Sequence, residues 1–153
     1  MPSIRETREL PFTAEQMFDL VADVGKYPEF LPWVVATRVR HDDKHTMTAD
    51  MLVGFKAIRE KFTSKVEKDR PNSIRVHYVD GPLRDLDNVW HFAPTHSGGC
   101  AIDFCVDFAF KSKMFEALAG QYIDRAFRKM VAAFEARAEE LYGSSSSSAQ
   151  SVA

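Results

Sequence analysis

The spacing of apolar residues over residues 113–142 predicts a long amphipathic helix. Proline is absent from this stretch, and apolar residues recur there at three- and four-residue intervals, as they do on one face of an α-helix. Their side chains would cover about half of the circumference, more than the ~100° stripe that suits a flat neighbour. We therefore expect a concave partner. Gly120 lies inside this helix at a cost of about 1 kcal/mol relative to alanine, so we expect either a strand or a ligand to approach its backbone.

The chain before this helix alternates apolar and polar residues in segments that end at turns, which is typical of strands with one buried face. Seven segments have this pattern, at residues 4–10, 34–41, 46–54, 58–67, 74–78, 86–92 and 102–110. Short turns between successive strands predict an antiparallel meander with one apolar face. Because large sheets twist and curl, this face supplies the concave partner that the long helix requires.

Two short helices are predicted between the first and second strands. Residues 13–16, Thr-Ala-Glu-Gln, have the form of a capping box and are followed by apolar residues at helical spacing. Residues 26–33 carry four large apolar side chains and two prolines, which predicts a single helical turn and a lid-like connection. The predicted fold class is α+β: a curved antiparallel sheet of about seven strands around a long C-terminal helix, in one domain over residues 1–142. Residues 143–153, which contain five successive serines, are predicted to be a flexible tail.

Composition narrows the function classes. Twenty Lys and Arg residues nearly balance 22 Asp and Glu residues, so the net charge favours neither nucleic acid nor a membrane surface, and we predict no DNA partner. Cys100 and Cys105 are five positions apart in an alternating strand, so their side chains should point to opposite faces and remain free thiols. Without a leader peptide or a run of 18 apolar residues, we predict a soluble cytoplasmic protein.

Three ordered motifs resemble the coenzyme-Q-binding branch of the START-like superfamily of lipid-transfer proteins and polyketide cyclases, whose fold is called helix-grip. They are residues 13–33 (TAEQMFDLV, DV and YPEFLPW), residues 79–94 (VDGPL with Leu86, Trp90, Phe92 and Pro94) and residues 130–138 (MVAAFEARA). The resemblance covers residues 2–142. It implies a helix-grip domain with two short helices after the first strand.

The resemblance also implies a function. Its members bind ubiquinone or a similar polyprenyl lipid between sheet and helix, as chaperones for respiratory electron transport, with transient contact at the periphery of the inner membrane. No catalytic cofactor is implied. The same branch includes bacterial ribosome-association toxins that bind the large ribosomal subunit. Val34 stands where eukaryotic members usually have cysteine, which, with the missing leader, favours a bacterial member and leaves both roles open.

A lipid cavity would draw on apolar residues of the sheet, the lid-like connection and the helix, although each of these residues could equally pack as core. The predicted lining is Phe30, Trp33, Met51, Phe62, Tyr78, Asn88, Trp90, Phe104, Phe108, Phe115, Leu118, Tyr122 and Phe127. Tyr78, Asn88 and Tyr122 are the candidates for contact with quinone oxygens, and residues 27–33 with 80–82 are the candidate mouth. Glu60 has the same parity as Phe62, so its carboxylate either points into the cavity or is turned outward by a bulge.

The sequence gives less support to other functions. No nucleophile elbow, phosphate loop or zinc motif is present, so we predict a protein that is not an enzyme, and a cyclase-like activity rests only on the superfamily resemblance. His41 and His45 flank a turn and do not favour a metal site. Residues 56–75 contain seven basic and three acidic residues, with Arg59, Lys61, Lys65 and Arg75 on the outward parity. This face is either an ordinary solvated surface or a contact for ribosomal RNA phosphates.

Overall fold

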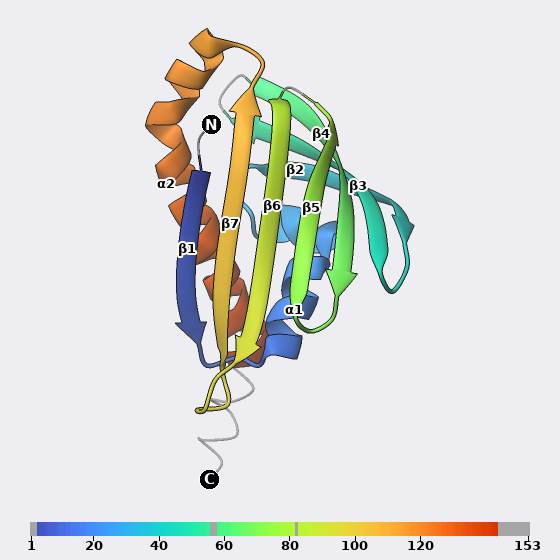
Figure 1. Cartoon of the computed structure of the whole chain (residues 1–153), viewed down its shortest axis with the longest axis vertical. Helices are drawn as coiled ribbons and strands as arrows, with labels where there is room; N and C mark the ends of the chain where they lie inside the picture. Colours follow the sequence, from blue (N-terminus) through green and yellow to red (C-terminus); the bar gives the residue numbers. More distant parts are fainter. Residues whose placement is uncertain (1–2, 56–57, 82, 144–153) are drawn as a thin grey trace.

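Seven strands form one antiparallel sheet in the order β1-β7-β6-β5-β4-β3-β2, and a long helix lies against its concave face (Figure 1). The structure is a computed structural model that describes residues 3–55, 58–81 and 83–143, without the side chains of residues 55, 58, 115 and 118–124. The strands are β1 (Ser3–Leu10), β2 (Val34–Asp42), β3 (Thr46–Phe55), β4 (Ile58–Asp69), β5 (Ser73–Asp80), β6 (Leu83–Pro94) and β7 (Cys100–Phe110). The helices are α1 (Ala14–Ala22), the 3-10 helix η1 (Val24–Glu29), α2 (Lys113–Ala138) and the π-helical turn η2 (Glu139–Gly143). The predicted α+β helix-grip fold is confirmed.

The alternation that predicted the strands also sets their faces. In β7, Ile102, Phe104, Val106 and Phe108 are buried on the concave side, whereas Asp103 is exposed on the convex side. The two cysteines follow the same rule: Cys100 is buried, Cys105 is half-buried on the other face, and both thiols are free. Register across β6 and β7 runs through eleven residue pairs, so these two strands are paired over most of their length.

The predicted capping box begins α1. The hydroxyl of Thr13 accepts a hydrogen bond from the backbone N–H of Gln16 at 3.1 Å, and the Gln16 side chain accepts one from the N–H of Thr13 at 2.9 Å. Both bonds satisfy N–H groups that have no partner inside the helix. They fix the direction in which α1 leaves Pro11, so that its apolar face is buried against the sheet.

We expect Thr13→Ala to lower the free energy of unfolding by about 1 kcal/mol, because it removes the hydroxyl acceptor at this N-cap. Thr13→Ser is the matched control, since it keeps the oxygen and should stay within a few tenths of a kcal/mol of the unmodified chain. Urea unfolding followed by circular dichroism measures both changes. Equal losses in the two variants would show that the methyl group of Thr13, rather than its oxygen, matters.

Most strand boundaries lie within two residues of the sequence prediction, and two boundaries differ by more. β6 begins at Leu83 rather than Leu86, because Leu83 already pairs with Phe110, with a register shift before Asp85. The final helix reaches Ala138 in α-helical form and then widens into η2. Gly120 lies within α2, but what approaches it lies outside the described residues, as does the predicted tail after Gly143.

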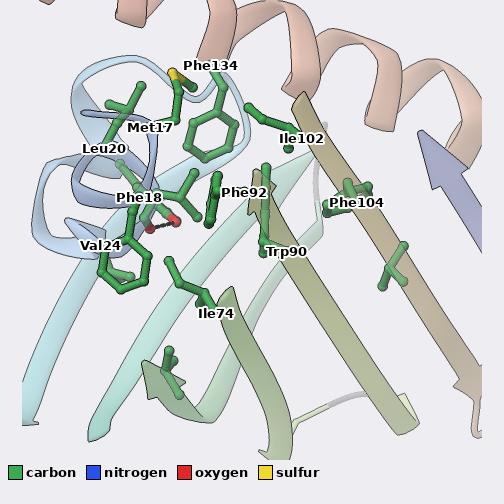
Figure 2. Packing of buried hydrophobic residues seen from close by; sticks show 14 of the residues in the cluster. Met17, Phe18, Leu20, Val24, Ile74, Trp90, Phe92, Ile102, Phe104 and Phe134 are labelled. Atoms are coloured by element: carbon green, nitrogen blue, oxygen red, sulfur yellow. Dashed lines mark hydrogen bonds between the residues drawn. The ribbon is translucent and has the colours of Figure 1, made fainter. Parts of the chain in front are cut away.

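Aromatic and aliphatic side chains pack together where α1 and the C-terminal half of α2 meet the sheet (Figure 2). Phe134 projects from α2 toward Trp90 on β6, with ring centroids 5.3 Å apart, and Phe18 of α1 packs edge-on against Phe92 at 5.9 Å. These side chains belong to one cluster of buried residues. Within the described part of the chain, no helix is long and apolar enough to cross a bilayer.

Candidate ligand cavity

A cavity of about 250 Å³ lies between the concave face of the sheet, α1, η1 and α2. Each strand from β3 to β7 contributes inward residues at alternate positions, and the helices contribute residues one turn apart. It is lined by Val21, Val24, Tyr27, Leu31, Val34, Met47, Ala49, Met51, Val53, Phe62, Ser64, Val66, Ile74, Val76, Tyr78, Leu86, Asn88, Trp90, Phe104, Val106, Phe127, Met130 and Phe134.

The cavity wall is almost entirely apolar. None of the lining residues in the described part of the chain is Asp, Glu, Lys, Arg or His. The Tyr27 hydroxyl donates to the backbone carbonyl of Val21, so its proton is already used. Burial, with a smaller effect of the Asp23 charge, raises the pKa of Tyr27 and keeps this hydroxyl neutral. A charged ligand group would therefore lose its hydration in this cavity without gaining an ionic partner.

Asn88 lies in the cavity wall, but its amide is occupied by the protein. Its Nδ2 donates to the backbone carbonyl of Cys105 at 2.9 Å, and its Oδ1 accepts from the indole Nε1 of Trp90 at 2.9 Å. One N–H and one lone pair of the amide remain. The sequence suggested Asn88 as a contact for a ligand oxygen, whereas these bonds give it a role in holding Trp90 against the sheet.

Tyr78 offers the more available polar group. Its hydroxyl oxygen accepts a hydrogen bond from the backbone N–H of Leu83 at 2.9 Å, and among the described residues its own proton has no acceptor. Burial raises the pKa of Tyr78, and the negative charges of Asp80 and Glu60 raise it further, against the opposite effect of the Leu83 bond. The hydroxyl is therefore protonated at neutral pH and can donate to a ligand carbonyl.

Ser64 is a cavity residue that sequence reasoning missed. It lies directly opposite Tyr78 in the β4–β5 register, and directly opposite Ala49 in the β3–β4 register. Directly opposed side chains have Cβ atoms about 4.5–5.5 Å apart, so Ser64 adds a hydroxyl beside the base of the Tyr78 side chain in an apolar wall. The signal was present in the sequence, because Ser64 shares the inward parity of Phe62 and Val66.

The structure brings seven of the thirteen predicted cavity residues to the lining. These are Met51, Phe62, Tyr78, Asn88, Trp90, Phe104 and Phe127. Phe115, Leu118 and Tyr122 lie outside the described side chains.

Three predicted residues do not line the cavity. Phe30 directly follows η1 and is half-buried, and its ring meets Phe134 at 5.3 Å and the guanidinium of Arg137 at 5.3 Å. Trp33 is half-buried where the chain enters β2, and its carbonyl accepts from the N–H of Gly54 at 2.8 Å. Phe108 is buried between Phe127 and Phe110, which fill the space beside it. Within residues 26–33, Tyr27 and Leu31 line the cavity in place of Phe30 and Trp33.

Glu60 is exposed and is not part of the cavity wall. It lies opposite Val53, which does line the cavity, so the parity argument is correct for its position in the register. The carboxylate nevertheless reaches solvent, because Glu60 lies in the first residues of β4. Its negative charge still contributes to the raised pKa of Tyr78.

Part of the basic convex face is neutralised by acidic neighbours. Arg59, Lys61, Lys65 and Arg75 are all exposed, as their parity predicted. Arg75 binds both carboxylate oxygens of Asp87 at 3.1–3.2 Å, and Arg40 binds Asp50 at 3.1 Å. Elsewhere, Arg70 pairs with Asp19, and Lys68 pairs with Asp42. Within the described residues, no group of three or more His, Cys, Asp or Glu side chains is arranged to hold a metal ion.

Comparison with known families agrees with the fold. A family model described as "Polyketide cyclase / dehydrase and lipid transport" matches residues 10–135. A solved structure, the 18 kDa protein CC1736 from Caulobacter crescentus, is 40% identical with a TM-score of 0.75, over 94% of this chain and 99% of that one. A START superfamily protein from Mycobacterium smegmatis is 18% identical with a TM-score of 0.75, over 91% of this chain and 98% of that one, and shows the fold alone.

Two kinds of curated relative are similar to the chain over most of its length. Ribosome association toxin RatA of Escherichia coli (strain K12) is 37% identical over 142 residues, which is 93% of this chain and 90% of that protein. Mitochondrial coenzyme Q-binding protein COQ10 homolog B of Xenopus laevis is 38% identical over 142 residues, which is 90% of this chain and 58% of that protein. The resemblance to the START-like superfamily and to this branch of it is thereby confirmed.

Proposed function

Because the chain belongs to the polyketide cyclase / dehydrase and lipid transport family, we propose that it binds a prenyl quinone such as ubiquinone and acts as a lipid chaperone that supports respiratory electron transport. The observation that carries this proposal is the cavity of about 250 Å³, whose wall is apolar apart from the hydroxyls of Tyr27, Ser64 and Tyr78, the amide of Asn88 and the indole N–H of Trp90. A quinone is uncharged, largely apolar and rich in carbonyl oxygens. It fits a wall that offers hydroxyl donors and no charge.

The cavity volume limits which part of the ligand is enclosed. A cavity of about 150 Å³ in another protein holds benzene, so about 250 Å³ accepts a substituted quinone ring and the start of a prenyl tail. The remainder of a long tail would extend beyond the cavity. Each Å² of apolar surface that the ligand hides contributes about 25 cal/mol, so the enclosed part supplies most of the affinity, and Tyr78 orients the ring.

The proposal is tested by the lipid that the protein carries. The full chain is purified without detergent from a bacterial host that makes ubiquinone, extracted with organic solvent and analysed by mass spectrometry. We expect a prenyl quinone in a ratio to protein that approaches one. If a different lipid is found in the same ratio, the protein binds lipid but the proposed quinone ligand is rejected. If no lipid is found, the whole proposal is rejected.

We expect Tyr78→Phe to weaken quinone binding about threefold to tenfold, because it removes one hydrogen-bond donor from the cavity wall. It should also lower stability by about 1 kcal/mol, since the N–H of Leu83 loses its acceptor. Quenching of tryptophan fluorescence by added short-chain quinone, with Trp33 replaced by Phe so that Trp90 is the emitter, measures the affinity. Trp90 is suited to this readout because its ring is part of the cavity wall.

Tyr142→Phe is the matched control for the hydroxyl. Tyr142 donates to the backbone carbonyl of Gln16 at 3.2 Å and does not line the cavity. This variant should lose stability without losing quinone affinity. If both variants weaken binding equally, the effect comes from general loosening of the fold, and the Tyr78 hydroxyl does not contact the ligand.

A second candidate function is binding to the large ribosomal subunit, which the similarity to ribosome association toxin RatA favours. The exposed basic residues Arg59, Lys61 and Lys65 would be the contact. The ion pairs of Arg40 and Arg75 with neighbouring carboxylates weaken this candidate, because each removes a positive charge from the face. Cosedimentation of the protein with large subunits at low salt, lost at high salt and in Lys61→Glu/Lys65→Glu, would support it over the quinone role.

A further inference from the structure

The two edges of the sheet differ in how they are protected. β2, at one edge, has two register shifts against β3, and the hydroxyl of its Thr37 donates to the carbonyl of Val24 in η1. Bulges and covering segments of this kind prevent an edge from pairing with another strand. β1, at the other edge, pairs with β7 through eight successive residues without a register shift. In the described part of the chain it has no other strand partner.

We propose that β1 pairs with β1 of a second copy of this chain, antiparallel and about a two-fold axis at Thr7, so that the two sheets become continuous. The sequence of β1, Ser-Ile-Arg-Glu-Thr-Arg-Glu-Leu, is self-complementary in this register. Arg5 faces Glu9 of the second copy, Glu6 faces Arg8, and Ile4 faces Leu10. Thr7 faces its own symmetry mate, and the two-fold axis generates each pair twice.

No neighbouring register is equally favourable. In a continuous sheet, side chains that lie directly opposite each other must be on the same face. The two-fold axis must therefore pass beside a residue, and the alternative registers are obtained by moving this axis one residue at a time along β1. An axis at Glu6 places two glutamates opposite each other, and an axis at Arg8 places two arginines there. Axes at Arg5 and Glu9 repeat these two conflicts. Because like charges directly opposite each other are unfavourable in a sheet, the axis at Thr7 is the one among these five, from Arg5 to Glu9, that avoids them.

The charges on the convex side of β1 are available for such a partner. Arg5 and Glu9 are exposed, and within the described residues neither forms an ion pair. Their neighbours on β7 are the uncharged Cys105 and Ala101, so the monomer gives them no directly opposed charge. On the concave side Arg8 lies 3.6 Å from Glu6 and 3.3 Å from Glu135 of α2. Pairing would place the second copy's Glu6 and Arg8 beside these groups as alternating charges.

The arrangement is compatible with the position of α2. Figure 1 shows β1 at the end of the sheet; the N-terminal half of α2 lies beside the start of β1 and its C-terminal half crosses behind the sheet, whereas an added strand would lie in the plane of the sheet. The exposed residues Arg5, Thr7 and Glu9 mark the convex side of this strand. Ile4 and Leu10 are half-buried, and in the dimer Leu10 of the second copy would cover Ile4, and Ile4 of the second copy would cover Leu10.

The first test is a charge swap read by sedimentation equilibrium of the full chain over a micromolar concentration series. The unmodified chain should approach twice its mass of 17.4 kDa. Arg5→Glu places glutamate opposite Glu9 twice in each dimer, and Glu9→Arg places arginine opposite Arg5 twice, so each should raise the dissociation constant at least about tenfold. Arg5→Glu/Glu9→Arg restores opposite charges and should restore the dimer. A monomer at all concentrations, or a double variant no better than the singles, would overturn the proposal.

The second test fixes the register by crosslinking. Thr7→Cys, in a Cys105→Ser background, places two thiols across the two-fold axis, and mild oxidation should give a covalent dimer. Ser3→Cys in the same background is the control, because the two cysteines would be about 26 Å apart along the paired strands. Equal crosslinking from both positions would indicate collisions rather than this interface and would overturn it. Thermal unfolding of each variant shows that the monomer fold is kept.

Discussion

Phe134→Ala is expected to lower the free energy of unfolding by about 3–5 kcal/mol, among the largest losses that a single substitution can cause here. Phe134 is only 4% exposed, and its ring meets the rings of Tyr27 at 5.5 Å, Phe30 at 5.3 Å and Trp90 at 5.3 Å. It therefore joins α2 to both η1 and the sheet. Truncation leaves a hole next to an existing cavity, and the surrounding rings cannot close both.

The size of this loss separates packing from helix propensity. Alanine is the better helix former, so any loss must come from the removed ring contacts. Arg128→Ala on the same helix is the control, because Arg128 is exposed and its replacement should change stability by less than about 0.5 kcal/mol. Guanidinium unfolding followed by Trp fluorescence measures both variants. A loss below about 1.5 kcal/mol in Phe134→Ala would mean that the C-terminal half of α2 packs more loosely than these ring distances indicate.

The fold was predictable because local patterns and global packing agree. A period of two over seven segments and a period near 3.6 over residues 113–142 leave few arrangements that bury both apolar faces. Thr13 and Gln16 could be recognised as a capping box since both bonds are local in sequence. The start of β6 was placed too late, because its pairing with Phe110 is a contact between distant segments that no local pattern reveals.

The cavity was less predictable for the same reason. Parity alone placed Met51, Phe62 and Phe104 on the inner face, and these residues do line the cavity. Parity could not show that Phe127 and Phe110 occupy the space beside Phe108, because this depends on where α2 crosses the sheet. The use of Asn88 was also hidden, since its partners are a backbone carbonyl on the next strand and an indole two residues away. Polar groups in a cavity can be assigned to ligands only after their internal bonds are known.

Filling the cavity should abolish lipid binding without unfolding the protein. Ala49 is 5% exposed, lines the cavity from β3 and lies opposite Ser64. In Ala49→Phe, a phenyl ring would project into the space of about 250 Å³ beside Ser64, within the cavity where the quinone ring is proposed to bind. Because the ring enters empty space rather than packed side chains, we expect the free energy of unfolding to be unchanged or to rise by up to about 2 kcal/mol.

The lipid content of purified Ala49→Phe, measured by extraction and mass spectrometry, should fall at least about tenfold, since a ligand cannot share the occupied volume. Leu52→Phe is the matched control, because Leu52 is on the same strand but faces the convex side, where it lies opposite Lys61. Its lipid content should equal that of the unmodified chain. If Ala49→Phe folds and still carries the full amount of lipid, the ligand binds outside this cavity. If both variants lose lipid equally, β3 as a whole, rather than the volume beside Ala49, controls binding.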